Sequence, residues 1–525
     1  MEKARLLAAV AGMVVVAAAG GALAQTFDET TVSFSFADDN VLRDPGETRI
    51  NSPSAYFGGK SATSLDRFED SVYRRTQSRL VLGKSFDTGV LSPEGALRVR
   101  LTPDGSGVYK LTDDTSYLKL NYVPSKALKA ALTLYPIDSD KFRLGYYYDI
   151  SWGGSNTFPK NFRKDLVPGL KLSVDTSRFG AFAGVKTALI RSPSETILDN
   201  PGGNVNQYVE RSYYAFLGGA KATLVEGLTV GVSGGYFDKG TNTSAAVLGK
   251  RIYSGGGGVY VAFHTGGEVG RRLDLRLYQE NPEEYPLGDS NWYKTQFGLD
   301  LVLEANALVQ TLEDPDNFGS TTNEWARAAY LGAAVRLDKL RMHLDTVYRD
   351  LPYIVYNVPG FVPYRALSDS ADLSHGGTLD FLPDVLGGEI SSVFSVDYYL
   401  QRLGLTPALS VGLLIPATFS TTDTGFTIEG PYASSQSLGL QKVVVRGSAA
   451  GDWDILPVGE HELPVFIGKL DLKYTLGKNF SAVGEVLYAR DPNFAQVLID
   501  DHGRAKRRFD KPDILGVGVV TEMTF

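Results

Sequence analysis

Charged side chains occupy alternate positions in many short segments of this sequence. In residues 96–101, for example, Arg98 and Arg100 alternate with aliphatic residues. A period of two places successive side chains on opposite faces of a β-strand, so one face would be apolar and the other charged. Such charges need water, or partners on neighbouring strands. The candidate residues for a charged, water-lined wall are Arg98, Arg100, Lys119, Arg143, Asp149, Lys171, Asp175, Arg272, Asp274, Arg276, Arg341, His343, Asp345, Lys469, Asp471 and Lys473.

Basic residues outnumber acidic ones in this set, although the whole chain has a formal net charge of −8. Cationic rings around an aqueous path favour anions, so the set predicts a mild anion preference if it lines a pore. The alternative is a ladder of ion pairs that only stiffens the wall. The acidic balance of the chain argues against nucleic acid as a partner.

Few residues have the spacing that catalysis or metal binding requires. None of the five histidines pairs with another at ligand spacing, and His343 shares a strand face with Arg341 and Asp345. Ser290, in the turn-like segment 288–291, has no histidine nearby in sequence. The acidic clusters match no ordered calcium loop, and the absence of cysteine excludes a thiolate metal site. We therefore expect no catalytic site, no metal and no cofactor.

The elements that must position the charged set are alternating strands. The segments with the clearest alternation are 96–101, 117–123, 142–152, 169–175, 271–279 and 466–475, and residues 142–152 are the most regular of all. Short links are expected at 137–141, 176–179, 225–227, 265–268, 338–339, 401–404 and 477–479, and long links at 153–167, 191–207, 238–251, 281–291, 351–388, 449–463 and 491–512. Alternation of short and long links is typical of antiparallel barrels in bacterial outer membranes.

The strand count has to be even if both chain ends lie on one side. Two adjustments satisfy that condition: an extra strand at 421–430, and a break at 304–306 that makes 307–311 a separate strand. The count is then about 22 strands, and about 18–22 when uncertain segments are allowed for.

The N-terminus has the three parts of a secretory signal peptide. Lys3 and Arg5 form a basic region, residues 6–23 are uncharged and apolar, and Ala22-Leu23-Ala24 offers a cleavage site. We expect residues 1–24 to be removed. Residues 25–73 are irregular and could sit in the lumen, cover the periplasmic mouth or add one strand, and residues 74–525 form the barrel.

The last segment, Ile514–Phe525, alternates apolar and small or polar residues and ends on an aromatic residue. It resembles the C-terminal strand of bacterial outer-membrane β-barrels of the porin class. A soluble sandwich could show the same faces, but the signal peptide and the tyrosines and tryptophans near strand ends favour a membrane. The resemblance implies an all-β transmembrane antiparallel barrel in the cell outer membrane, with Phe525 as an assembly signal read by the barrel-assembly machinery.

The expected function is a porin-like channel for passive diffusion of small hydrophilic solutes. Residues 351–388 and the N-terminal segment are the candidates for a constriction. Lys506, Arg507 and Arg508, in the last expected outer loop, could contact the phosphates of lipopolysaccharide.

The main alternative is a barrel that conducts nothing and anchors or guides an export, adhesion or motility machine. Residues 28–32 loosely resemble the energy-coupling box of a TonB-dependent transporter, but the region before the barrel is too short for a plug domain. An outer-membrane phospholipase-like enzyme lacks a recognisable Ser/His/acid pattern. The oligomeric state is not readable from the sequence.

Overall fold

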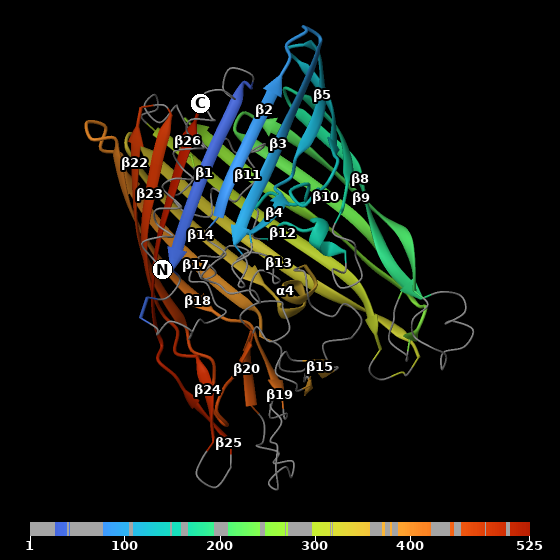
Figure 1. The fold of residues 1–525 in the computed structure, drawn as a ribbon, viewed down its shortest axis with the longest axis vertical. Helices are drawn as coiled ribbons and strands as arrows, with labels where there is room; N and C mark the ends of the chain where they lie inside the picture. The colour runs from blue at the N-terminus through green and yellow to red at the C-terminus, as the bar shows by residue number, and fades with distance from the viewer. Residues whose placement is uncertain are drawn as a thin grey trace.

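The computed structural model forms a closed barrel (Figure 1). The residues that the structure describes are 27–38, 41–42, 77–103, 109–147, 150–158, 166–193, 208–241, 247–267, 269–270, 297–314, 317, 319–357, 370–372, 378–380, 387–421, 441–445, 453–477, 479–499 and 505–525. The expected signal peptide lies outside them.

Eighteen antiparallel strands form the ring, and it closes where β26 pairs with β1. In order around the barrel they are β1 (Glu29–Asp38), β2 (Gln77–Ser85), β3 (Leu91–Pro103), β5 (Tyr117–Ser125), β6 (Leu128–Tyr135), β7 (Gly169–Thr176), β8 (Phe179–Pro193), β9 (Tyr208–Val225), β10 (Leu228–Thr241), β11 (Arg251–Gly266), β12 (Phe297–Glu313), β13 (Thr321–Leu337), β14 (Leu340–Arg349), β17 (Glu389–Tyr398), β18 (Leu405–Ile415), β22 (Val465–Leu476), β23 (Phe480–Arg490) and β26 (Asp513–Thr524). A further strand, β4 (Tyr109–Asp113), pairs only with the end of β3. The predicted all-β barrel is confirmed.

Alternate residues of the strands face outward, and they are the apolar ones. Leu118 on β5 and Leu172 on β7 are each more than half exposed on the outer surface. Asn121, at an inward position of β5, is buried. This arrangement hides membrane character from bulk hydropathy, because only every second residue faces lipid. No helix among the described residues is long and apolar enough to cross a membrane.

The strand number falls at the lower end of the expected range, and one adjustment behind the higher count is wrong. Strand β12 runs without a break from Phe297 to Glu313, so no turn exists at 304–306. Of the expected extra strand at 421–430, Thr421 ends β19 (Thr418–Thr421), which lies outside the ring, and 422–430 fall outside the described residues. The expected strand at 271–279 also lies outside them.

Residues 25–73 had three expected placements, and the structure shows one of them for its described part. Strand β1 joins the ring between β2 and β26, with Val32 opposite both Leu80 and Met523. The chain also ends on this seam, where the backbone N–H of Phe525 donates to the carbonyl of Thr30 over 2.9 Å. The barrel therefore begins at residue 29.

Links on one side of the barrel are short, and both β1 and β26 have their terminal ends on that side. The short links are residues 86–90, 126–127, 177–178, 226–227, 338–339, 399–404 and 477–479; β11 and β12 are joined on the same side by residues 267–296. Asp338, in a two-residue link, has a φ of 55°, a left-handed conformation that such tight hairpins require. The links on the other side hold α4 (Leu351–Asn357) and three small sheets, β15 (Ser370–Asp372) with β16 (Thr378–Asp380), β19 with β20 (Gln441–Val445) and β21 (Trp453–Ile455), and β24 (Ala495–Ile499) with β25 (Ala505–Phe509).

The described residues of the expected strand at 142–152 form no strand. Residues 136–168, which link β6 to β7, form the feature that we call the lumen insert. Its described part contains the short 3-10 helix η4 (Ser155–Thr157) and a bridge between Leu144 and Trp152. The expected short link at 137–141 is likewise wrong, because it belongs to this long link.

Candidate functional site

The lumen insert carries an apolar core into the barrel interior. Leu144, Ile150 and Trp152 are almost completely buried and belong to one cluster with inward-facing wall residues and α4. The Trp152 ring lies 6.2 Å from the ring of Phe237 on β10, measured between centroids. On the far side of the insert, the ring of Tyr147 stacks on Tyr330 of β13 at 3.6 Å. Each large side chain buried in this way contributes about 1.5–3 kcal/mol.

Glycines in the wall make room for this core. A Cβ atom on Gly235 of β10 would lie 2.8 Å from Cδ1 of Leu144, and one on Gly184 of β8 would lie 2.5 Å from the Phe142 ring. Larger residues at either position would collide with the insert. Glycine at these two positions is therefore a packing requirement of the insert.

Buried polar groups of the wall fix the insert backbone. The carboxylate of Glu304 accepts the backbone N–H groups of Tyr146, over 2.8 Å, and Tyr147, over 2.6 Å. The side-chain amide of Asn306 donates to the carbonyl of Ile150 over 2.9 Å. These contacts satisfy peptide groups that would otherwise be buried without partners.

Helix α4, in the link between β14 and β17, contacts the insert at the same point. The hydroxyl of Tyr353 donates to the carbonyl of Ile150. Burial, and then the nearby charge of Glu304, raise the pKa of Tyr353 well above its usual range, so the hydroxyl keeps its proton. Residues 351–388 were expected to contribute a constriction, and the described part of that link does contact the insert.

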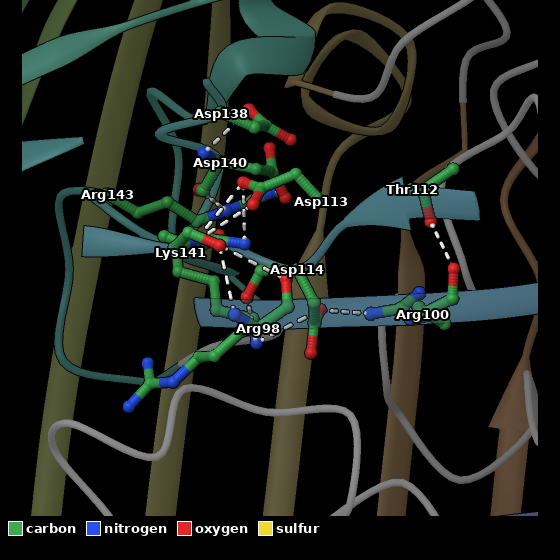
Figure 2. Close-up of polar contacts among 11 residues, drawn as sticks. Arg98, Arg100, Thr112, Asp113, Asp114, Asp138, Asp140, Lys141 and Arg143 are labelled. Atoms are coloured by element: carbon green, nitrogen blue, oxygen red, sulfur yellow. Dashed lines mark hydrogen bonds and ion pairs between the residues drawn. The ribbon is translucent and has the colours of Figure 1, made fainter. Parts of the chain in front are cut away.

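Opposite charges gather where the insert meets β3 and β4 (Figure 2). Arg100 pairs with Asp114, and the Nζ atom of Lys141 lies 3.1 Å from an oxygen of the same carboxylate. Arg143 pairs with Asp140 over 2.6 Å. Together with Arg98, whose guanidinium lies 4.8 Å from the centre of the Tyr117 ring, these residues form what we call the insert charge cluster.

Water reaches part of this region. The side chains of Arg100 and Asp140 are 28% and 21% exposed. On the neighbouring strand β5, Lys119 pairs with Glu94 over 2.9 Å, and both are similarly exposed. These charges are therefore partly hydrated.

A second set of charges lies on β14, β17, β22 and β23 and is dry. Arg341 forms a two-pronged pair with Asp397, with distances of 2.9 and 3.1 Å, and both side chains are at most 3% exposed. Lys469 lies 3.3 Å from Asp471 and 3.1 Å from Glu485, and all three are buried. We call these residues the dry pairs.

The remaining expected wall residues have varied surroundings. Lys171 lies over the rings of Phe142 and Phe182 at 5.4 and 5.3 Å, and Asp175 is 3.5 Å from Lys221. Asp345 accepts a hydrogen bond from Tyr330. His343 is buried, Lys473 is half-buried, and Arg143 lies in the insert rather than on a strand. Asp149, Arg272, Asp274 and Arg276 lie outside the described residues.

The expected lipopolysaccharide contacts lie in the β24–β25 hairpin, which projects at the end opposite the C-terminus (Figure 1). Arg508 is exposed, whereas Arg507 is half-buried, and burial lowers its pKa to about 10 in spite of the nearby Asp454 charge. The side chain of Lys506 is outside the described part of the chain.

Sequence reasoning missed the residues that hold the insert, namely Glu304, Asn306 and Lys186. The Nζ atom of Lys186 donates to the carbonyl of Ser139 over 2.6 Å, inside the barrel. Each is a polar residue at an inward position of a long alternating strand, and that position was the available signal. No group of three metal-ligating side chains occurs among the described residues.

No protein-family model and no curated protein matches the sequence. Solved structures similar to the chain include OpdL of Pseudomonas aeruginosa, with 10% identity over 95% of this chain and 97% of that one and a TM-score of 0.40. OprD of Pseudomonas aeruginosa has 12% identity over 95% and 93%, with a TM-score of 0.40. OmpF of Salmonella typhi, in complex with daunomycin, has 12% identity over 95% and 96%, with a TM-score of 0.35. These scores carry no functional argument, and the barrel assignment rests on its own closed ring of strand pairs.

Proposed function

We propose that the chain is a porin-like outer-membrane channel for passive diffusion of small hydrophilic solutes, and that solutes pass along the insert charge cluster. The partly hydrated charges of β3, β5 and the insert carry this proposal. A structural ion-pair ladder has no need of water, whereas a diffusion path must keep charged groups hydrated along its wall.

Selectivity for charge would be weak. Arg100, Lys119 and Arg143 each have an acidic partner, so the basic excess that the sequence suggests is largely compensated. Arg98 has two buried nitrogens, Nε and Nη1, without a hydrogen-bond partner among the described residues. Its charge supports a mild preference for anions.

Conductance in a planar bilayer tests the proposal. We expect discrete open channels from the purified, folded protein, and a reversal potential in a KCl gradient that is displaced slightly toward the chloride potential. Folded barrels that insert but carry no current would contradict the channel, and cation selectivity would contradict the anion preference.

A barrel that anchors or guides an envelope-spanning machine is the second candidate. The apolar core that the lumen insert shares with α4 and with β19–β21 favours it, because a packed core in the interior leaves less room for solutes. The same bilayer measurement separates the two candidates.

We further propose that residues 1–24 direct export and that the short links face the periplasm, as in bacterial outer-membrane barrels. In this orientation the β24–β25 hairpin lies at the outer surface, where Arg508 could contact lipopolysaccharide. Phe525 would be the residue read by the assembly machinery. Outer-membrane fractionation of the full chain, followed by N-terminal sequencing of the mature protein, tests the location and the cleavage site.

A further inference from the structure

An apolar groove opens on the outer surface of β11–β14. Its volume is about 360 Å³, within the range of small-ligand sites. The outward-facing side chains that line it include Val259, Leu303, Ala305, Ala329, Leu331 and Tyr348. Because Leu303 and Leu331 are exposed on the lipid-facing side, the groove faces hydrocarbon and not the lumen.

Two alanines create the depression. Ala305 and Ala329 are directly opposite each other in the β12–β13 pairing. Their neighbours in the same row are Val259 on β11 and Tyr348 on β14, both exposed and much larger. The groove is therefore only two strands wide, with walls of bulky side chains.

The positively charged side chain of Arg327 lies at the end of this groove nearest the long links. Arg327 lies two residues before Ala329 on β13, so both side chains point outward, and Arg327 is exposed. Within the described part of the chain, the guanidinium of Arg327 has no hydrogen-bond or ion-pair partner. Asp350 feels the charge of Arg327, but its carboxylate accepts the backbone N–H groups of Arg327 and Tyr353, over 2.9 and 2.8 Å, and not the guanidinium.

The position of Arg327 along the strand corresponds to the membrane interface. Trp325, the next outward residue toward the long links, is more than half exposed, and exposed aromatic residues form a girdle at this level in outer-membrane barrels. A lipid-facing arginine near the interface destabilises a barrel only slightly, and its planar guanidinium can form paired hydrogen bonds with a phosphate group.

We propose that this groove holds one acyl chain of an anionic lipid from the leaflet on the long-link side, with its phosphate on Arg327. A second copy of the protein is the less suitable occupant. A stable contact between copies buries about 800 Å² on each partner, whereas the groove is two strands wide, and the free charge of Arg327 would be enclosed without a partner.

Lipid retention measured by native mass spectrometry tests this site. The barrel would be released from detergent micelles that contain equal amounts of phosphatidylglycerol and phosphatidylcholine. We expect one tightly retained lipid, enriched in phosphatidylglycerol. Arg327→Gln should reduce this enrichment about fivefold, the value of one interfacial arginine. Ala329→Leu, which fills the groove, should reduce retention of both lipids.

Two matched controls lie elsewhere on the surface. Arg402→Gln removes an exposed charge in the short link 399–404, and Ala482→Leu enlarges a half-buried, outward alanine on β23. Neither should change lipid retention. Equal enrichment in the unaltered protein and in Arg327→Gln would overturn the proposal. So would an oligomer that Ala329→Leu dissociates, since the groove would then be an interface between copies. The site does not depend on conduction, and Arg327→Gln should leave channel currents unchanged.

Discussion

The insert charge cluster and the dry pairs have the same chemistry and different surroundings. Both place arginine or lysine beside carboxylates on inward positions of the barrel. Arg100 in the cluster and Lys119 on the neighbouring strand β5 keep 28% and 20% of their side chains exposed, whereas Arg341 and Lys469 keep 2% each. Ion pairs that water reaches contribute little to stability and can exchange partners, but buried pairs cannot lose a member without a large penalty. The proposed channel therefore places solute contact at the partly exposed Arg100, Asp140 and Lys119, and wall integrity at the dry pairs.

Breaking a dry pair should produce the largest effect. Lys469→Met leaves Asp471 and Glu485 buried side by side without their shared cation. We expect a loss of about 3–5 kcal/mol in the free energy of unfolding. Urea titration in lipid vesicles measures it. Lys119→Met is the matched change in the hydrated region and should cost less than about 1 kcal/mol. Equal losses in the two variants would remove the distinction between the regions.

Removing a hydrogen-bond acceptor of the insert should produce the second largest effect. Glu304→Ala deprives the backbone N–H groups of Tyr146 and Tyr147 of their acceptor, and the expected loss is about 2–3 kcal/mol. The insert should then move, so single-channel currents should become larger and noisier. Wild-type currents from this variant would show that the insert does not border the conducting path.

A larger side chain where the wall packs against the insert should lower the free energy of unfolding by about 1–3 kcal/mol. In Gly235→Ala the new methyl group would lie 2.8 Å from Leu144. Leu144→Ala is destabilising by itself, but it removes the contact, so the loss in the double variant should be smaller than the sum of the two single losses. Additive losses measured in the double-mutant cycle would mean that the two residues do not touch.

Removing a hydrated charge should alter selectivity more than stability. Arg100→Ala leaves Lys141 beside Asp114, so the carboxylate stays paired. We expect a change in unfolding free energy below about 1 kcal/mol and a smaller anion preference in reversal-potential measurements. An unchanged reversal potential would place the solute path away from Arg100.

The smallest expected effect is at the seam beside the short links. Hydrogen bonds from Lys84 and Ser85 lower the pKa of Asp28 from 3.8 to about 2. Because the folded-state pKa is depressed, any stabilisation is complete above pH 3.8 and is lost as the pH falls toward 2. An NMR titration of Asp28 should show a higher pKa in Lys84→Met. An identical pKa in that variant would exclude the lysine as the cause.

The alternating pattern predicted the barrel correctly because the outer face repeats in every strand. It failed at residues 142–152, where Leu144, Ile150 and Trp152 fit the alternation of a strand but are buried inside the barrel. A side chain that packs inside the barrel and one that faces lipid have the same polarity, so a single sequence does not separate them. The break expected at 304–306 came from the requirement for an even strand count. Glu304 and Asn306 instead lie within a continuous strand and bind the insert.

The charged set was partly predictable for a related reason. Side chains alternate between the two faces of a strand, so the apolar face of one strand shows which of its residues point inward. This alternation identified Arg98, Arg341 and Lys469. Whether water reaches that position depends on neighbouring strands and on segments far away in sequence. Pairing partners such as Asp397 and Glu485 come from other strands, and no local pattern indicates them.

Because the chain contains no cysteine, single cysteines can test the central distinction directly. Lys119→Cys places a thiol in the hydrated region, and Ser410→Cys places one at a buried inward position of β18. A negatively charged methanethiosulfonate reagent would be added during single-channel recording. We predict a lower conductance and a weaker anion preference for Lys119→Cys, with no change for Ser410→Cys. A response at Ser410→Cys, with none at Lys119→Cys, would contradict the assignment of the conducting path.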